Sequence, residues 1–337
     1  MLRLSVLDQS VALAGRDQAA SIRETLALAE ACEALGYHRF WVSEHHNLPS
    51  IVGTAPEILM AAIAARTSRI RIGSAGIMLP HYAALKVAEQ FRVLDALAPG
   101  RIDLGVGRAP GSDGRTAQAL NAGGAARTND FPEQVRDLMA WVNGEALPEN
   151  HPFASIRAQP TSQTAPNVWM LGSSDYGAQV AAFFGLPYSY AAFITDGAGT
   201  EHALATYRQL YRPSARNPQP VANICLWALV ADTDEEAQRL FTSRARWRVG
   251  RDRGIFGPLT APEEDPPFPF TPADEARVSD LRKTAFVGSA ATVGARLREL
   301  AAQLGIAEIV VLTWSHDPVA RRRSYELLAA EFGLPSS

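Results

Sequence analysis

The stretch RFWVSEHHN, residues 39–47, joins a short run of strand-like residues directly to a carboxylate and two neighbouring imidazoles. The residues up to Ser43 are β-prone and mostly apolar, and they predict a buried strand. Glu44, His45 and His46 follow at once. In folds with parallel strands, binding and catalysis gather at the carboxyl ends of the strands. This boundary is therefore a candidate functional position.

The same order of strand and then helix recurs along the chain. Thr54 and Glu57 have the spacing of a capping box before the second helix. Strands are predicted at residues 2–8, 39–42, 69–76, 100–107, 167–174, 187–191, 223–231 and 308–314, and helices at 22–35, 58–65, 85–97, 132–143, 176–184, 201–210, 235–248 and 319–332. Eight alternations in 337 residues predict an α/β fold of the (β/α)8 TIM barrel type, with a doubly wound open sheet as the alternative.

Residues 251–285 interrupt this rhythm before the last strand. The segment GPLTAPEEDPPFPFTP at 257–272 contains six prolines, which excludes a regular helix or a central strand there. We interpret 251–285 as a Pro-rich insertion that forms an ordered excursion, a mobile lid or a linker, with an additional helix over 290–304. The whole chain, 1–337, is expected to form a single barrel domain.

Composition narrows the classes of function. With 47% apolar residues the chain can bury a large core, and its net charge of -3 gives no electrostatic basis for binding nucleic acid. No window approaches the roughly 20 apolar residues of a membrane span, and residues 1–8 lack the pattern of a secretory signal. Cys32 and Cys225 are far apart, so neither a disulfide framework nor a thiolate metal site is expected. These features predict a soluble, cytoplasmic protein.

The Glu44-His45-His46 triplet has more than one interpretation. Adjacent side chains on an extended chain point to opposite faces, and only His81 lies near enough in sequence to add a ligand, so no metal site is predicted. The triplet fits acid–base chemistry better, because imidazole titrates near neutral pH. The alternative is that both histidines only cap the strand through hydrogen bonds.

The ends of the third and fourth strands are rich in glycine. The third strand ends at Ser74, Ala75 and Gly76, and Arg108 follows the fourth within GVGRAPG. This segment departs from the dinucleotide-binding fingerprint, because Pro110 takes the position of the third glycine. Arg108 is interpreted as a permanent cation for a phosphate or an electron-rich ring, or else as part of a surface ion pair.

The fifth strand ends in LGSSDYG, which places Ser173 and Ser174 between a strand and a helix. Hydroxyl groups and free backbone N–H groups at a helix N-terminus can bind an anion. The alternative is that Ser174 is only an N-cap, and Asp175 favours this alternative because a carboxylate suits the same helix end.

Four blocks of the sequence, in order, resemble the bacterial luciferase-like family of flavin-dependent (β/α)8 proteins. They are LGYHRFWVSEHHN, RIGSAGIMLPHYAALKVAEQFRVLDALAPGRIDLGVGRAPG, GSSDYGAQVAAFFGLPYSYA and FVGSAATVGARLRELAAQLGIAEIVVLT. The resemblance covers nearly the whole chain. It is specific for the superfamily and says much less about the substrate.

The resemblance implies a role for each strand end. Glu44 would lie near the isoalloxazine ring of a flavin and His45 would be the catalytic imidazole, with a cis peptide bond between Ala75 and Gly76. Arg108 would contact the flavin phosphate or the ring edge. The implied cofactor-binding residues are Ser74, Ala75, Gly76, Arg108, Gly172, Ser173, Ser174 and Gly177.

The resemblance also implies an activity and partners. The leading hypothesis is a monooxygenase that uses reduced FMN and O2 to oxidise a small organic substrate through a peroxyflavin, with reduced FMN supplied by a flavin reductase. Hydride transfer with the deazaflavin F420 and a non-catalytic flavin-binding protein are the alternatives. Luciferases carry a cysteine where Gly107 stands and a carboxylate where Ser173 stands, so light emission is not expected.

Two further expectations concern surfaces and the substrate. By family analogy a homodimer is expected, formed through the helices near 56–65 or 84–97. The large aromatic residues after several strands either line an apolar substrate pocket or belong to the core. They are Trp41, Phe193, Trp227 and Trp314.

Overall fold

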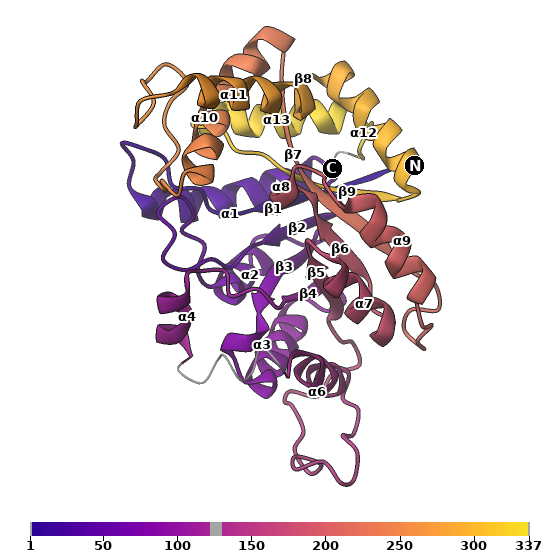
Figure 1. The fold of residues 1–337 in the computed structure, drawn as a ribbon. Helices are drawn as coiled ribbons and strands as arrows, with labels where there is room; N and C mark the ends of the chain where they lie inside the picture. Colours follow the sequence, from indigo (N-terminus) through magenta and orange to yellow (C-terminus); the bar gives the residue numbers. More distant parts are fainter. Residues whose placement is uncertain (1, 122–129, 336–337) are drawn as a thin grey trace.

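The computed structural model describes residues 2–121 and 130–335, in which the strands close into a barrel (Figure 1). Parallel pairing runs from β1 through β2, β3, β4, β5, β6 and β7 to β9, which pairs back with β1. The (β/α)8 prediction is therefore confirmed, and the open sheet is excluded. The strands are β1 (Arg3–Asp8), β2 (Arg39–Val42), β3 (Arg71–Met78), β4 (Ile102–Gly107), β5 (Asn167–Gly172), β6 (Tyr188–Ala191), β7 (Ala222–Ala231), β8 (Phe286–Ser289) and β9 (Glu308–Leu312).

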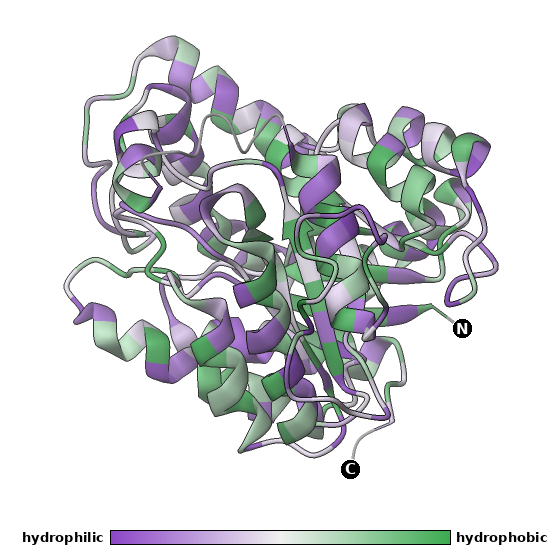
Figure 2. Ribbon diagram, turned by 90° about the horizontal axis from the view of Figure 1, so that it is seen from below, coloured by the Kyte–Doolittle hydropathy of each residue, from purple (hydrophilic) through white to green (hydrophobic). Residues whose placement is uncertain are grey.

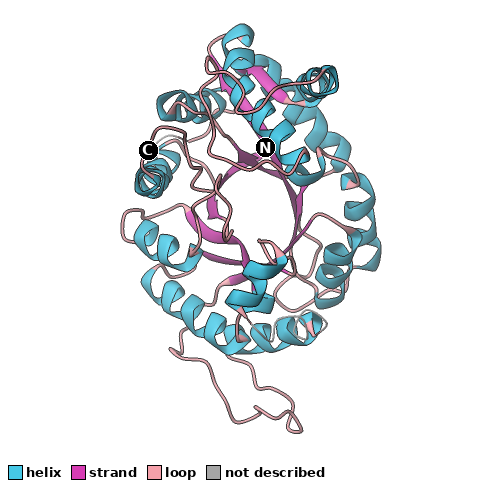
Figure 3. Cartoon of the chain, turned by 60° about the vertical axis from the view of Figure 1, so that its left-hand side comes forward, coloured by secondary structure: helices cyan, strands magenta, loops and turns pink. Residues whose placement is uncertain are grey.

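Helices surround this ring of strands, which Figure 3 shows nearly end-on. The helices are α1 (Gln18–Ala34), α2 (Pro56–Ala64), the 3-10 turn η1 (Leu79–His81), α3 (Ala84–Leu97), α4 (Gly114–Leu120), α6 (Phe131–Asn143), α7 (Asp175–Phe184), α8 (Ala192–Thr195), α9 (Thr200–Leu210), α10 (Asp234–Asp252), α11 (Pro272–Thr284), α12 (Ala290–Leu304) and α13 (Pro318–Glu331). No helix within the described ranges is long and apolar enough to cross a membrane.

The capping box predicted before α2 is wrong. The N-cap residue is Ala55, which makes no side-chain capping hydrogen bond, and the helix begins at Pro56. Proline suits the first helical position, because its φ is already helical and it has no N–H group that would need a partner. The proline, rather than Thr54, therefore fixes the start of this helix.

The interruption at 251–285 is shorter than the sequence suggests. Helix α10 continues to Asp252, and α11 begins at Pro272, where Thr271 and Asp274 form a capping box. Only the proline-rich part between the two helices is irregular, as predicted from its prolines. The sequence interpretation missed β8, which extends the sheet by pairing with the second half of β7.

Three apolar clusters of described residues hold the fold together. The largest packs the outward faces of the strands against the helices, and a second one inside the barrel includes Trp41, Trp169 and Trp314. The third packs β7 and β8 against α10 and α11. Figure 2 shows hydrophobic residues along the central strands and a mixture of hydrophobic and hydrophilic residues on the surrounding helices. The strand ends themselves are the places where polar residues enter the barrel.

Candidate functional site at the carboxyl ends of the strands

The carboxyl ends of β2 to β5 open onto a shared cavity of about 300 Å³. Most of the residues implied by the sequence line it, although they come from four separate strand ends. The predicted residues in its wall are His45, Ala75, Gly76, Arg108, Gly172, Ser173, Ser174 and Gly177. Glu44 and Ser74 are not in this wall, and they act on it from behind.

Ser74 joins two strands of the barrel instead of facing the cavity. Its hydroxyl donates to the carbonyl oxygen of Gly105 at 2.9 Å and accepts from the Gly105 N–H at 3.1 Å. The side chain is fully buried. Ser74 therefore fixes the position of β4 relative to the end of β3.

The backbone after Ser74 forms one side of the cavity. The Ala75–Gly76 peptide bond is cis, as the family resemblance implied, and the β3–β4 register is irregular between Ser74 and Ile77. A Cβ atom on Gly76 would lie 2.5 Å from the Leu171 side chain and 2.8 Å from the Gly105 carbonyl oxygen. Only glycine fits this position without displacing the neighbouring strand ends.

Glu44 is a buried acceptor that ties three segments together. Its carboxylate accepts hydrogen bonds from the Tyr82 hydroxyl at 2.6 Å, the His46 Nε2 at 2.8 Å and the Met78 N–H at 2.9 Å. Burial, followed by the contact with this carboxylate, raises the pKa of Tyr82. Glu44 therefore positions the ends of β2 and β3, and it also holds the His46 imidazole through a hydrogen bond.

His45 is the imidazole that faces the cavity. Its Nδ1 lies 3.2 Å from the Ser43 hydroxyl, and its backbone N–H donates to the Gly53 carbonyl oxygen at 3.1 Å. Burial lowers the pKa of His45 to about 4; Glu44 opposes this shift, whereas His46 and Arg251 reinforce it. His45 is therefore neutral near pH 7 and can both donate and accept a hydrogen bond.

The loop between β5 and α7 has the form of an anion cradle. Gly172 and Gly177 approach so closely that a Cβ atom on either would lie 3.3 Å from the Cα atom of the other. Ser174 occupies the N-cap position of α7 but makes no side-chain capping bond, contrary to the simple N-cap interpretation. Its exposed hydroxyl and the helix N-terminus remain available to an anion.

The groups around this cradle are held in place from two sides. The hydroxyls of Tyr188 and Tyr190 on β6 donate to the backbone carbonyl oxygens of Ser174 and Ser173, each at 3.3 Å. Asp175, which would repel an anion, forms an exposed ion pair of 3.2 Å with His202. The carbonyl groups are thus directed away, which leaves donor groups at the cavity.

Arg108 contributes the only arginine side chain in the described wall of this cavity. Its guanidinium lies 3.9 Å from the centre of the Tyr176 ring, next to the start of α7. Within the described ranges it makes no ion pair, so the alternative of a surface ion pair is wrong. A stacked, exposed arginine of this kind can bind a phosphate or cover a flat ring.

A second cavity of about 610 Å³ adjoins the first. The two share His45, Phe193 and Ile194. Its walls confirm that Phe193, Trp227 and Trp314 line a pocket, and they add residues that the sequence interpretation missed. The additional residues include Gln9, Asn47, Asp113, Trp247, Arg251 and Phe256.

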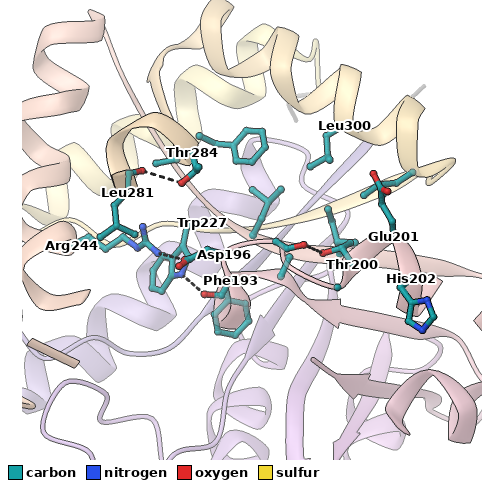
Figure 4. Close-up of a pocket in the computed structure, with 18 residues that line it drawn as sticks. Phe193, Asp196, Thr200, Glu201, His202, Trp227, Arg244, Leu281, Thr284 and Leu300 are labelled. Carbon is teal, nitrogen blue, oxygen red and sulfur yellow. Dashed lines mark hydrogen bonds and ion pairs between the residues drawn. The ribbon is translucent and has the colours of Figure 1, made fainter. Parts of the chain in front are cut away.

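A third cavity of about 530 Å³ lies on the outer side of β7, between α9, α11 and α12. Figure 4 shows Phe193 and Trp227 on its barrel side, across from Thr284 and Leu300. Phe193 and Trp227 meet edge to face at 5.9 Å, and the Trp227 Nε1–H donates to the Phe193 carbonyl oxygen at 3.0 Å. This aromatic pair separates the third cavity from the strand ends, so we place the chemistry in the first two.

The described residues contain no group of side chains arranged to hold a metal ion. His81, the one additional ligand considered from the sequence, has its Nε2 2.8 Å from the Pro110 carbonyl oxygen. This contact fixes the loop after β4. The imidazoles near the mouth thus serve hydrogen bonding in this structure.

The chain is similar to known proteins over nearly its whole length. Residues 2–308 match the family described as luciferase-like monooxygenase. The chain is 36% identical to a luciferase-like monooxygenase of Escherichia coli (strain K12), over 97% of this chain and 96% of that protein. It is 35% identical to the N-acetyl-S-alkylcysteine monooxygenase of Bacillus subtilis (strain 168), over 98% of both chains.

Solved structures show the same fold. The crystal structure of apo-MsnO8 is 34% identical, with a TM-score of 0.87, over 100% of this chain and 99% of that one. At 19% identity, the oxygenating part of 3,6-diketocamphane monooxygenase from Pseudomonas putida in complex with FMN has a TM-score of 0.69, over 98% and 97% of the two chains. At 14% identity, an F420-dependent secondary alcohol dehydrogenase has a TM-score of 0.67, over 98% of each.

Proposed function

Because this chain belongs to the luciferase-like monooxygenase family, we propose that it is a monooxygenase that takes reduced FMN, O2 and a small organic substrate. When bound, reduced flavin supplies two electrons, so that one atom of O2 enters the substrate and the other leaves as water. The observation that carries the proposal is the convergence of His45, the Ala75–Gly76 bond, Arg108 and the β5–α7 cradle on one cavity.

The residues of the first cavity fit a phosphorylated flavin. The close approach of Gly172 and Gly177 and the free hydroxyl of Ser174 suit a phosphate at the start of α7. Arg108 adds a permanent positive charge beside it. Ala75 and Gly76 offer backbone rather than bulky side chains, as a flat ring requires.

His45 is the proposed proton-handling group. It lies in the wall shared by the first and second cavities, so it can face both a ring and a substrate. As a neutral imidazole it can accept a proton at one nitrogen while Ser43 fixes the other. Glu44 is a positioning residue, because its hydrogen bonds hold the segments around His45.

The aromatic second cavity is the proposed substrate site. Its indole and phenyl groups exclude water and suit an apolar substrate. The segment between α10 and α11 covers one side through Phe256, and the Leu259 N–H bonds the Ala12 carbonyl oxygen at 2.8 Å. We extend the proposal to this segment as the cover of the mouth, within a single barrel domain.

The proposal includes two protein partners. A separate flavin reductase supplies reduced FMN, because GVGRAPG departs from a dinucleotide-binding fingerprint. A second copy of this chain packs on α2 and α3, where Ile58, Val93 and Leu97 are 67%, 48% and 62% exposed. Exposed apolar side chains in such a patch are typical of an interface.

Oxygen transfer can be tested directly. The protein is supplied with FMN, NADH, a flavin reductase and ¹⁸O2, and with an aldehyde, a ketone and a thioether, including the kind of thioether named for the B. subtilis relative. We expect one ¹⁸O atom per product molecule and no product without the protein. Product that forms equally with the reductase alone, or the absence of product on every substrate, would contradict the proposal.

Hydride transfer with F420 is the second candidate, because an F420-dependent dehydrogenase shares the fold. The two candidate functions require different cofactors in the first cavity: reduced FMN for the monooxygenase and reduced F420 for hydride transfer. Titrations of the protein with reduced FMN and with reduced F420 decide between them. Tighter binding of reduced F420, with oxidation of an alcohol in the absence of O2, would replace the monooxygenase proposal.

A further inference from the structure

The second cavity contains buried polar atoms that have no hydrogen-bond partner in the described chain. Gln9 and Trp314 are each only 2% exposed, yet the Gln9 Oε1 and the Trp314 Nε1–H are unpaired. The Trp247 Nε1–H in the same wall is also unpaired. Buried polar groups are normally satisfied, because an unmade hydrogen bond destabilises the fold. Several such atoms around one cavity indicate a ligand that satisfies them.

Arg251 gives this cavity an unneutralised positive charge. The nearest carboxylates, Asp196 and Asp252, are both already bound by Arg248 and Arg277, at 2.8 to 3.0 Å. Within the described ranges the Arg251 side chain makes no hydrogen bond or ion pair. Its guanidinium is partly buried at the end of α10 and lines the same wall as His45.

The arginines of α10 increase the positive field further. Arg244 lies on the same helix face and is 5% exposed, and Asp196 at 4.0 Å is its one ion-pair partner among the described residues. Its Nε is also without a hydrogen-bond partner, and Figure 4 shows this side chain beside Trp227 and Asp196. An anion bound at Arg251 would therefore also be attracted by the positive charge of Arg244, without direct contact.

The remaining groups define the rest of the ligand. A primary carboxamide such as that of Gln9 offers one acceptor and one NH2 donor, and a secondary amide matches both. The indoles of Trp247 and Trp314 meet at 4.5 Å, and those of Trp227 and Trp314 at 4.8 Å, so they form a continuous aromatic wall for an apolar group. The wall also contains Asn47 and Asp113, but these two side chains bond each other at 3.3 Å, and Asp113 further accepts from the Thr116 hydroxyl and N–H. The groups of the described wall left for a ligand are thus the Arg251 cation, the Gln9 amide and the aromatic surface.

We infer that the second cavity binds an N-acylated amino acid with an apolar side chain, its carboxylate on Arg251 and its amide on Gln9. The apolar side chain then lies along the tryptophans, with His45 at the boundary to the first cavity. This inference deepens the proposed function, because it names the substrate class of the monooxygenase. It makes Arg251 and Gln9 specificity-determining residues.

Ligand binding without flavin tests the inference separately from turnover. The probe is N-acetyl-L-methionine, followed by calorimetry and by the fluorescence of the tryptophans in the wall. Two matched ligands each lack one group: the methyl ester lacks the charge, and 4-(methylthio)butanoic acid lacks the amide. We expect the unmodified protein to bind the probe at least tenfold more tightly than either, since each matched ligand lacks one of the two polar groups that Arg251 and Gln9 would bind.

The variant Arg251→Gln removes the charge with little change in shape. It should weaken binding of the probe about 10- to 100-fold and leave binding of the methyl ester unchanged, and Arg251→Lys should restore part of the loss. Gln9→Met should weaken binding of the probe and leave binding of 4-(methylthio)butanoic acid unchanged. Thermal unfolding verifies that each variant is folded. If Gln9→Met does not fold, the comparison of Arg251→Gln with Arg251→Lys decides the case.

The outcomes separate this inference from the proposed function. Charge-dependent binding without any turnover in the presence of reduced FMN would overturn the monooxygenase proposal and support the ligand class. Turnover of uncharged substrates, with no binding of the probe, would overturn the ligand class and leave the monooxygenase proposal intact. Equal loss of acid and ester in Arg251→Gln would also overturn the inference.

Discussion

At the amino-terminal end of the barrel, Asp103 accepts hydrogen bonds from Arg39 at 2.7 Å, Arg71 at 2.6 Å and the Trp41 Nε1–H at 3.1 Å, whereas at the carboxyl end the polar atoms of Gln9, Trp247 and Trp314 are unpaired. Both ends are buried, and both contain charged or polar side chains. They differ in where the unpaired polar atoms lie: at the carboxyl end such atoms line one cavity, whereas at the amino-terminal end the charged groups pair with one another.

The charged groups of the amino-terminal end form a network of ion pairs, in which the Glu308 Oε2 alone has no partner among the described residues. Arg39 also donates to Glu308 at 2.7 Å, and Glu308 accepts from the Ser5 hydroxyl at 2.6 Å. Burial alone would raise the pKa of Asp103, but Arg39 and Arg71 outweigh it and hold the pKa below its ordinary value. This network joins the first residues of β1, β2, β3, β4 and β9 and contributes to the stability of the fold. Unpaired buried atoms occur at both ends, as Asn223 and Glu308 show, but those at the carboxyl end surround a cavity, and that combination marks the binding end.

The largest effect is expected at the functional end, from His45→Ala. Loss of a group that transfers protons in the rate-limiting step lowers turnover by about 10²- to 10⁴-fold, whereas FMN affinity stays close to that of the unmodified protein. Steady-state turnover and an FMN titration measure the two quantities. The matched control is His151→Gln, whose imidazole pairs with Asp137 at 3.2 Å on α6. Equal turnover in His45→Ala and His151→Gln would remove His45 from the mechanism.

At the structural end, Asp103→Ala should reduce stability without acting on the cavity directly. It leaves Arg39 and Arg71 in a buried site without their shared carboxylate, and breaking a buried ion pair in this way costs about 3–5 kcal/mol. Urea unfolding measures the loss. Asp232→Ala, which breaks an exposed ion pair with Arg323, is the control and should unfold at the same urea concentration as the unmodified protein. Similar midpoints for both variants would contradict the contrast between the two ends.

A smaller effect is expected from Ser174→Ala. Removing the free hydroxyl at the start of α7 deletes one hydrogen bond to a phosphate and should weaken FMN about tenfold. Riboflavin has the same ring system without the phosphate, so its affinity should not change. Fluorescence titrations of both flavins provide the measurement. A parallel loss for riboflavin would show that Ser174 acts on the ring or on the fold instead.

The smallest effect concerns pH. Because the pKa of His45 is lowered to about 4, its imidazole remains neutral from pH 5 to 8 and becomes charged only as the pH falls toward 4. The profile of kcat/KM should therefore show no His45 inflection near the ordinary imidazole pKa of about 6.5. An inflection between pH 6 and 7 that disappears in His45→Gln would contradict the burial of this side chain.

The strand ends could be located from sequence because their signals are local. A run of apolar β-prone residues followed by Glu44 and His45, or by the glycines of LGSSDYG, marks a strand and its loop in one short segment. Gln9 stands directly after β1, so the same rule applied to the first strand would have identified it. The three-dimensional fold then brings these separate ends together at one mouth.

The remaining features depend on packing that no short segment encodes. Trp247 and Arg251 lie one turn apart on α10, and their positions in the second cavity follow from how this helix crosses the barrel mouth. The unpaired state of Arg251 depends on Asp196, which is far away in sequence and already bound by Arg248 and Arg277. Strand β8 has only four residues and directly follows residues 251–285, the segment interpreted from sequence as an insertion.

A crystal structure of the protein with FMN tests the central claim most directly. The account predicts the phosphate at the Ser174 hydroxyl and the first N–H groups of α7, with the ring along Ala75 and Gly76 and beside His45. Flavin bound instead in the cavity behind Phe193 and Trp227, or with its phosphate away from α7, would contradict it.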